Sequence, residues 1–202
     1  MTESHYFSRE VGRPERLLRV SLPVADRELE LVTSDNVFSY RRVDRGTLVL
    51  IEEMDIPRGG RVLDLGCGYG PLSVSASLRG ASVAAVDVNQ RAIWLARTNL
   101  SRHANTPWVV VRGDLYGPFN FEFDTIICNP PIRSGRDTVL RIIREGQQYL
   151  RDGGSLQLVA RTRMGAKTLA SIMEEEYGNV EVAGRKSGYR VLLSRRRGGR
   201  VD

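Results

Sequence analysis

The sequence predicts an α/β fold in which a mostly parallel sheet is covered by helices on both faces. Short runs rich in Val, Ile and Leu recur from residue 61 onward, and helical patterns separate most of them. The length agrees with this prediction, because 202 residues are enough for one such domain to bury a core without disulfides or metals.

The elements follow one another in a regular order. The predicted strands are 61–66, 82–87, 109–114, 123–129 and 155–160, and the predicted helices are 70–79, 89–103, 137–151 and 165–177. Helix stop signals agree, since Gly80 follows the first helix and Asp152-Gly153-Gly154 follows the third. Two last strands, 179–184 and 189–195, are joined by the short loop 185–188. They should pair antiparallel, which completes a seven-stranded sheet.

The first 60 residues show a different pattern. Apolar residues alternate before and after a turn at Pro23–Glu28, at Leu18, Val20, Leu22, Leu29 and Leu31. This alternation predicts a β-hairpin, and Thr47 to Met54 then predicts a helix. We expect a hairpin extension over 1–45 that packs on a domain over 46–197, with a short tail at 198–202.

Composition indicates a cytoplasmic protein with a basic surface. Cys67 and Cys128 lie in apolar or glycine-rich runs, which favours buried thiols in a reducing compartment over a disulfide. The sequence shows neither a membrane-span-length apolar stretch nor an apolar signal core at its N-terminus. The net charge is +6, and only Lys167 and Lys186 of the 30 basic residues are lysine. This arginine excess suits phosphate contacts with a nucleic acid, and a GC-rich genome or a hot habitat is the alternative explanation.

A glycine-rich turn follows the first core strand and precedes a helix. Its glycines fall at Gly66, Gly68 and Gly70, unlike the spacing of a dinucleotide fingerprint. This spacing favours a cofactor without pyrophosphate, whose methionine carboxylate and amino group must be held, as in S-adenosylmethionine (SAM). Asp64 would then orient the ammonium end, directly or through water. A strand-to-helix turn that binds nothing is the structural alternative.

Two further acids end the next two predicted strands. Asp87 is placed to accept hydrogen bonds from both ribose hydroxyls, unless it caps the following helix, a task that Asn89 can take over. Asp114 can accept from the adenine amino group with Leu115 against the ring, or it can simply stabilise a turn. Ligands bind at the carboxyl ends of the strands in open α/β sheets, so the three acids together predict a SAM site.

Asn129-Pro130-Pro131 follows the fourth predicted strand at the same edge of the sheet. Proline fixes the backbone and removes donors, which leaves a stiff loop with outward-facing carbonyls. The Asn129 side-chain oxygen and the Pro130 carbonyl can both accept from one amine and stabilise the positive charge that develops on it. The motif therefore predicts methyl transfer to a nitrogen, with an ordinary turn as the alternative.

Segments spread over nearly the whole chain match one enzyme family. They are His5-Tyr6-Phe7-Ser8, Val37-Phe38-Ser39-Tyr40, Val43–Thr47, Asp64–Gly70, Asp114-Leu115-Tyr116, Asn129–Gly135 and Gly188-Tyr189-Arg190-Val191. The sequence thus resembles the methyltransferase small domain proteins, specifically guanine-N2-methyltransferases of small-subunit ribosomal RNA and their short archaeal homologues. The resemblance implies a Rossmann-like class I SAM-dependent methyltransferase that acts on RNA, with guanine N2 as the acceptor.

One position departs from the pattern of related amine methyltransferases. Ile132 stands where many of them have Tyr or Phe stacked on the target base. Phe38 and Tyr40 are the expected replacement platform, although Phe38 can equally pack in the N-terminal core. Arg133 and Arg136 are candidate phosphate contacts or ordinary solvated charges.

Three functions are compatible with these residues. The leading one is methylation of an exocyclic amine in RNA, most readily guanine N2 of ribosomal RNA or tRNA. The second is methylation of a protein glutamine, as in release-factor modification, but such enzymes usually carry Tyr at the position of Ile132 and a helical N-terminal domain. The third is a non-catalytic RNA-binding or assembly factor, against which the intact Asn129 and Asp87 argue. The sequence leaves the oligomeric state open.

Overall fold

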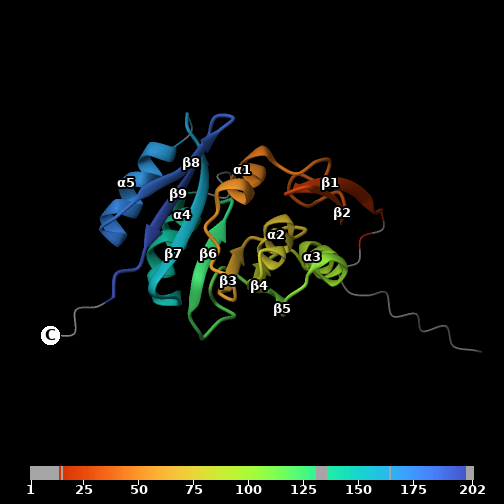
Figure 1. Cartoon of the computed structure of the whole chain (residues 1–202), viewed down its shortest axis with the longest axis horizontal. Coiled ribbons are helices and arrows are strands. Elements are labelled where there is room, and N and C mark those ends of the chain that lie inside the picture. The colour runs from red at the N-terminus through yellow and green to blue at the C-terminus, as the bar shows by residue number, and fades with distance from the viewer. Residues whose placement is uncertain (1–13, 15, 131–135, 164, 199–202) are drawn as a thin grey trace, which may run out of the picture.

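The computed structural model describes residues 14, 16–130, 136–163 and 165–198. A seven-stranded sheet forms its centre, in the order β5-β4-β3-β6-β7-β9-β8 (Figure 1). β5, β4, β3, β6 and β7 are parallel, whereas β9 runs antiparallel to both β7 and β8. The predicted α/β class and the antiparallel C-terminal hairpin are therefore confirmed.

Most elements have the predicted type and place. The strands are β1 Leu18–Val24, β2 Arg27–Thr33, β3 Arg61–Leu65, β4 Ser82–Asp87, β5 Trp108–Arg112, β6 Phe123–Cys128, β7 Leu150–Arg161, β8 Glu181–Lys186 and β9 Tyr189–Arg195. The helices are α1 Arg45–Glu53, α2 Pro71–Leu78, α3 Gln90–His103, α4 Arg136–Gly146, the 3-10 turn η2 Gln147–Tyr149, and α5 Ala166–Tyr177.

The sheet separates two apolar cores, because successive strand residues point to opposite faces. On β3, Val62 packs with α1, α2 and α3, whereas Leu63 and Leu65 pack with α4 and α5. Figure 1 shows the two helix groups on opposite sides of the sheet. The same alternation places Asp64 on the side of α2, where Ser73 donates to it.

The third core helix is shorter than its predicted span of 137–151, since α4 ends at Gly146. Two tyrosine hydroxyls donate to carbonyls of its last turn, Tyr116 to Ile142 and Tyr177 to Ile143. A Cβ at Gly146 would lie 2.8 Å from both hydroxyls, so only glycine leaves room for them. The helix thus ends where its carbonyls find partners outside the helix.

Gly153 and Gly154 were predicted to stop a helix, and this prediction is wrong. They lie in the long strand β7. The register between β6 and β7 shifts there, because Phe123 pairs with Leu150 and Thr125 pairs with Ser155. Gly153 has a φ of +78°, and a Cβ on Gly154 would lie 3.0 Å from the Asp124 carbonyl oxygen. Glycine is therefore required by a bulge and by a close backbone approach.

The strands predicted at 179–184 and 109–114 are also displaced, since β8 spans Glu181–Lys186 and β5 spans Trp108–Arg112. The loop before β9 contains only Ser187 and Gly188, both with positive φ, which is the geometry of a tight two-residue hairpin. Arg185 and Lys186 therefore belong to β8. At the other edge of the sheet, β5 ends at Arg112, so that Asp114 lies beyond the strand rather than at its end.

The N-terminal hairpin β1–β2 is confirmed and packs against α3. The buried Asn99 of α3 receives a hydrogen bond from the Val32 N–H and donates to the Val32 and Tyr69 carbonyls, all at 2.8 Å. One side chain thus joins the hairpin to the glycine-rich turn. The boundary between extension and domain at residue 45 stays a prediction.

Both cysteines are buried and free, as predicted. In the described part of the chain, every helix is too short or too polar to cross a membrane.

Candidate active site

A cavity of about 740 Å³ opens at the carboxyl ends of β3, β4, β6 and β7. The glycine-rich turn, the end of β4 and Asn129 all line it. Residues from the loop before α1 and from the start of β9 line it as well. The structure therefore brings most of the sequence-predicted site residues to one cavity.

The glycine-rich turn leaves space that a side chain would fill. Gly66 and Gly68 have φ values of +70° and +56°, and a Cβ at either position would meet no atom within 4 Å. Both residues line the cavity, so a ligand can approach their backbone closely. Gly70 differs, because its Cβ would lie 3.3 Å from Ala96 of α3. Gly70 serves the packing of α3 and does not line the cavity.

Asp87 is held in place by the backbone of two neighbouring segments. The Gly68 N–H donates to its Oδ2 at 2.9 Å, and the Asn89 N–H donates to its Oδ1 at 2.8 Å. Asn89 caps α3 by accepting from the Arg91 N–H at 3.0 Å, so the cap does not depend on Asp87. Each Asp87 oxygen keeps a free lone pair, which fits the expected contact with two ribose hydroxyls.

Asp64 lies behind the cavity rather than in it. It is fully buried, and its Oδ2 accepts from the Ser73 hydroxyl at 2.5 Å. Burial raises the pKa of this carboxyl from 3.8 to about 7. Its Oδ1 is buried without a hydrogen-bond partner among the described residues. Because Asp64 does not line the cavity, a contact with a ligand ammonium through water fits this carboxyl better than a direct one.

Asp114 and Leu115 line the rim of the cavity next to β5. The Asp114 side chain is 62% exposed and forms an ion pair with Arg141 of α4 at 2.8 Å. Leu115 adopts a positive φ of 46°, an uncommon conformation for a branched apolar residue. Their proposed contacts with adenine stay a prediction at this exposed rim.

Asn129 is anchored by two residues that are absent from the site predicted from the sequence. Its Nδ2 donates to Asp44 Oδ2 at 3.2 Å and to Thr47 Oγ1 at 2.9 Å. A carboxylate can only accept, so Asp44 selects the NH₂ end of the amide. The Asn129 carbonyl oxygen is thereby left for a donor in the cavity.

The fixed position of Asp44 follows from the start of α1. Asp44 is the N-cap residue, and its Oδ2 accepts from the Gly46 N–H at 2.8 Å and from the Thr47 N–H at 3.3 Å. A Cβ on Gly46 would lie 2.9 Å from the Tyr189 ring, so glycine lets α1 pack against β9. The Asp-x-Gly-Thr spacing before an apolar run is the signal that could have identified this cap.

Apolar and basic side chains line the outer part of the cavity. Phe38 is 66% exposed at the cavity, so its alternative assignment to the N-terminal core is wrong. Tyr40 packs against the apolar core and does not line the cavity. Arg161 and Tyr189, absent from the predicted site, line it together, and Arg161 Nε donates to the Tyr189 hydroxyl at 2.9 Å.

Part of the predicted catalytic loop lies outside the described residues. Pro130 is buried and lines the cavity directly after Asn129. Pro131, Ile132 and Arg133 belong to the segment that the structure does not describe. Arg136 is the exposed first residue of α4.

The chemistry of the remaining side chains is limited. Burial raises the pKa of the Cys67 and Cys128 thiols above its ordinary value, so both stay protonated near neutral pH. Among the residues that the structure describes, no cluster of three or more His, Cys, Asp or Glu has the arrangement of a metal site. The cavity thus presents hydrogen-bond acceptors, apolar surface and the basic side chain of Arg161.

Comparison with known proteins places the chain among methyltransferases. The family model for the methyltransferase small domain matches residues 28–193. The uncharacterized protein YbxB of Bacillus subtilis (strain 168) is 29% identical over 197 residues, which cover 95% of this chain and 98% of YbxB. Ribosomal RNA small subunit methyltransferase C of Alcanivorax borkumensis is 32% identical over 177 residues, which cover 84% of this chain and 53% of that protein.

A solved structure shares the fold over most of the chain. The T. thermophilus 16S rRNA N2 G1207 methyltransferase (RsmC), in complex with AdoMet and guanosine, matches with a TM-score of 0.81 and 25% identity. The match covers 91% of this chain and 52% of that one. This chain therefore spans about half the length of the two ribosomal RNA methyltransferases. The fold, the cofactor cradle and the family match lead to one conclusion: the protein belongs to the methyltransferase small domain family, whose cofactor is SAM.

Proposed function

We propose that the protein transfers a methyl group from SAM to the exocyclic N2 amine of guanine in RNA, with small-subunit ribosomal RNA as the first candidate. The anchored amide of Asn129 carries this proposal. Its NH₂ end is engaged by Asp44 and Thr47, which leaves its carbonyl oxygen for an amine in the cavity. The names of the relatives, ribosomal RNA methyltransferase C and a guanosine-bound N2 methyltransferase, support this acceptor.

The residues of the cavity meet the chemical requirements of this reaction. When bound, SAM supplies an electrophilic methyl group on a positively charged sulfur. An exocyclic amine on a base is conjugated and weakly nucleophilic, so it must be aligned accurately. Asn129 Oδ1 and the Pro130 carbonyl accept its two N–H groups and stabilise the positive charge that develops on nitrogen. Phe38, exposed at the cavity, offers an aromatic face on which the base can stack.

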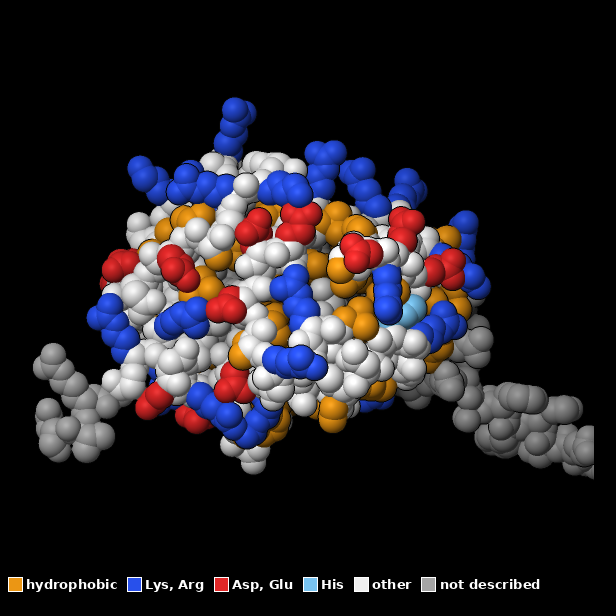
Figure 2. Space-filling model, viewed as in Figure 1, with side chains coloured by type: hydrophobic (Ala, Val, Ile, Leu, Met, Phe, Trp, Pro, Cys, Tyr) orange, Lys and Arg blue, Asp and Glu red, His pale blue; other side chains and the backbone are white. Residues whose placement is uncertain are grey.

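The distribution of arginines favours RNA as the substrate. Arg161 lines the cavity, and Arg41, Arg42 and Arg45 flank the cavity residues Ser39 and Asp44 in sequence. None of these four exposed arginines forms a salt bridge with another residue that the structure describes. Figure 2 shows Lys and Arg side chains along the edge above α1 and the ends of β8 and β9. Such a rim is suited to phosphate contacts.

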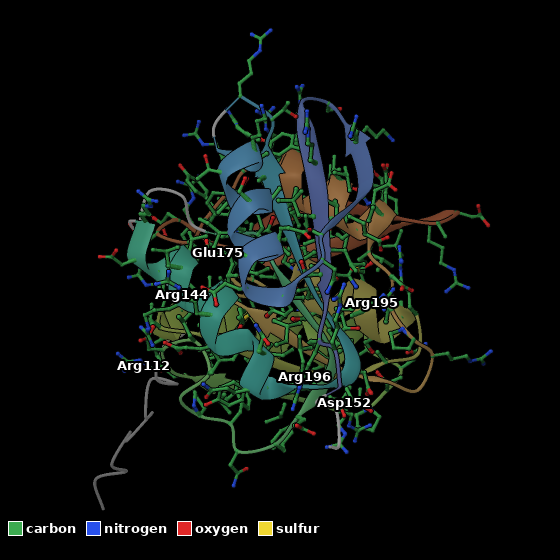
Figure 3. The ribbon with its side chains drawn as sticks, turned by 90° about the vertical axis from the view of Figure 1, so that its left-hand side faces the viewer. Arg112, Arg144, Asp152, Glu175, Arg195 and Arg196 are labelled. Carbon is green, nitrogen blue, oxygen red and sulfur yellow. The ribbon has the colours of Figure 1, made fainter. Side chains whose placement is uncertain are left out.

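The C-terminal arginines, by contrast, are used inside the fold. β9 pairs with β7 so that Tyr189 lies at the cavity edge of the sheet and Arg195 at the opposite edge. Arg195 pairs with Asp55 at 2.8 Å, and Arg196 pairs with Glu122 at 2.8 Å and with Asp152 at 3.4 Å. Figure 3 shows Arg195, Arg196 and Asp152 near the lower end of the sheet in that view. These arginines are therefore not part of the proposed RNA surface.

The N-terminal residues also favour RNA over a protein glutamine. Among the described residues, Leu18–Val24 and Arg27–Thr33 form the hairpin β1–β2, whereas the release-factor type of enzyme is expected to carry a helical domain before its core.

The proposal is tested with methyl-labelled SAM and separate pools of tRNA, ribosomal RNAs and isolated ribosomal subunits. Digestion and mass spectrometry identify the labelled nucleoside, with Asn129→Ala as the catalytic control. We expect N2-methylguanosine that disappears in the variant. Label in protein, or in another nucleoside, would contradict the proposed acceptor.

RNA contact at the arginine rim is tested separately. The double variant Arg41→Ala/Arg42→Ala should weaken RNA binding and reduce its salt dependence, because fewer counterions are released. Arg144→Ala is the control, since Arg144 is also exposed but pairs with Glu176 on α5. Equal losses in both variants would contradict a dedicated RNA surface at the cavity.

A further inference from the structure

The two oxygens of the Asp44 carboxylate have different environments. Oδ2 accepts from the Gly46 N–H, the Thr47 N–H and the Asn129 amide. All hydrogen bonds that the described residues donate to Asp44 go to this oxygen. The side chain is half-buried and lines the cavity. Oδ1 is therefore an acceptor without a described donor, on a carboxylate adjacent to the proposed catalytic amide.

A fixed carboxylate at this place discriminates among bases that carry an exocyclic amine. In guanine, the ring nitrogen N1 next to the 2-amino group carries a hydrogen and is a donor. In adenine and cytosine, the ring nitrogen next to the amine is an acceptor. A carboxylate can only accept, so it attracts the guanine edge and repels the corresponding edge of the other two bases.

Resting on the function proposed above, we propose that Asp44 is the specificity-determining residue for guanine. Its Oδ1 accepts the N1–H of the base while Asn129 Oδ1 accepts from the adjacent 2-amino group. The 3.2 Å hydrogen bond from Asn129 Nδ2 to Asp44 Oδ2 joins the two side chains that carry these acceptors, as two neighbouring donors on one base require. Neither side chain must reorganise, because Asp44 is fixed by the cap of α1.

Asp44 has two tasks that substitutions can separate. As the cap residue it satisfies backbone donors of α1, and asparagine or serine can also perform this task. In the Asp44→Asn variant, the carbonyl oxygen of the introduced amide can still accept from the Asn129 amide. The variant then presents an NH₂ donor where Asp44 presents Oδ1, so the preference for a base should change without loss of the helix cap.

Guanosine and 2-aminopurine riboside are the matched probes. Both carry the 2-amino group, but N1 is a donor in guanosine and an acceptor in 2-aminopurine. Binding is measured on the full chain with S-adenosylhomocysteine, by the fluorescence of 2-aminopurine riboside and its displacement by guanosine. We expect the unmodified protein to prefer guanosine by at least about tenfold, the discrimination typical of one well-placed base contact.

The variants decide between a specificity role and a purely structural one. Asp44→Asn should lower the guanosine preference at least about tenfold by binding 2-aminopurine riboside more tightly, and Asp44→Ser should bring the two affinities close together. Thr47→Val, which removes the other anchor of Asn129, should weaken both probes and leave their ratio unchanged. Affinity for S-adenosylhomocysteine checks the fold of each variant.

Two results would overturn the inference while the proposed function stands. The first is equal affinity of the unmodified protein for guanosine and 2-aminopurine riboside. The second is a ratio of these two affinities that Asp44→Asn leaves unchanged. If neither nucleoside binds to protein that binds S-adenosylhomocysteine, the proposed function and this inference are both wrong.

Discussion

Replacement of Asp64 by asparagine should change how the stability of the protein depends on pH. Asp64 is fully buried, and burial raises the pKa of its carboxyl from 3.8 to about 7 in the folded protein. The unfolded chain therefore releases this proton at lower pH than the folded protein does. The contribution of the Asp64 carboxyl to the free energy of unfolding is fully present below pH 3.8 and is lost as the pH rises toward 7.

The size of the effect follows from the two pKa values. Each pH unit within the window costs the folded state about 1.4 kcal/mol. Between pH 5 and pH 8, the Asp64 carboxyl should lower the free energy of unfolding by about 2.5 kcal/mol. The amide in the Asp64→Asn variant does not titrate, so this decline of the free energy of unfolding with pH should be absent. The unpaired NH₂ group of the variant costs about 1–3 kcal/mol at every pH and does not change the dependence on pH.

The assay is urea unfolding of the ligand-free protein at pH 5, 6, 7 and 8 and constant ionic strength, followed by tryptophan fluorescence. The difference between protein and variant isolates Asp64, because other titrating groups contribute to both. Ser73→Ala gives a second check of sign. The Ser73 hydrogen bond lowers the pKa of Asp64, so its loss should extend the decline in stability to higher pH. If the free energy of unfolding depends on pH in the same way in the protein and in Asp64→Asn, the conclusion that Asp64 is a buried, protonated acid is refuted.

Three other substitutions separate cofactor binding, fold and alignment. Gly68→Ala should lower SAM affinity at least about tenfold, because the added methyl group enters the space of the cofactor. The left-handed backbone at this position should also lower the stability of the variant by about 1–2 kcal/mol. Calorimetry measures both the affinity and the stability. Unchanged SAM affinity would contradict the cradle. Asn99→Leu should lower the free energy of unfolding in urea by about 3–5 kcal/mol, since three backbone groups lose their buried partner. A loss below about 1 kcal/mol would mean that water replaces the Asn99 side chain as their partner. Thr47→Val should reduce the rate of RNA methylation about three- to tenfold at unchanged SAM affinity, because Asn129 loses one of its two hydrogen-bond partners. An unchanged rate would show that Asp44 alone suffices to hold Asn129 in place.

The local pattern of the chain was enough to predict most of the architecture. Apolar periodicity and turn residues act over a few positions, so they identified the strands, the N-terminal and C-terminal hairpins and the glycine-rich turn. The errors occurred where a local signal has more than one use. Gly153 and Gly154 can end a helix or form a bulge, and only the pairing of β7 with β6 decides between them. Similarly, Gly146 ends α4 because two distant tyrosines need the space.

The sequence by itself determined that Asp87, the glycine-rich turn and Asn129 meet at one edge of the sheet, since each follows or ends a parallel strand. Only the tertiary structure placed Asp44 beside Asn129, 85 positions later in the chain. It also buried Asp64 behind the cavity and paired the C-terminal arginines away from it. The physical reason is that periodicity and turn chemistry report neighbours along the chain. Contacts such as that between Asp44 and Asn129 depend on the order of the strands and on the packing of α1 across β7 and β9.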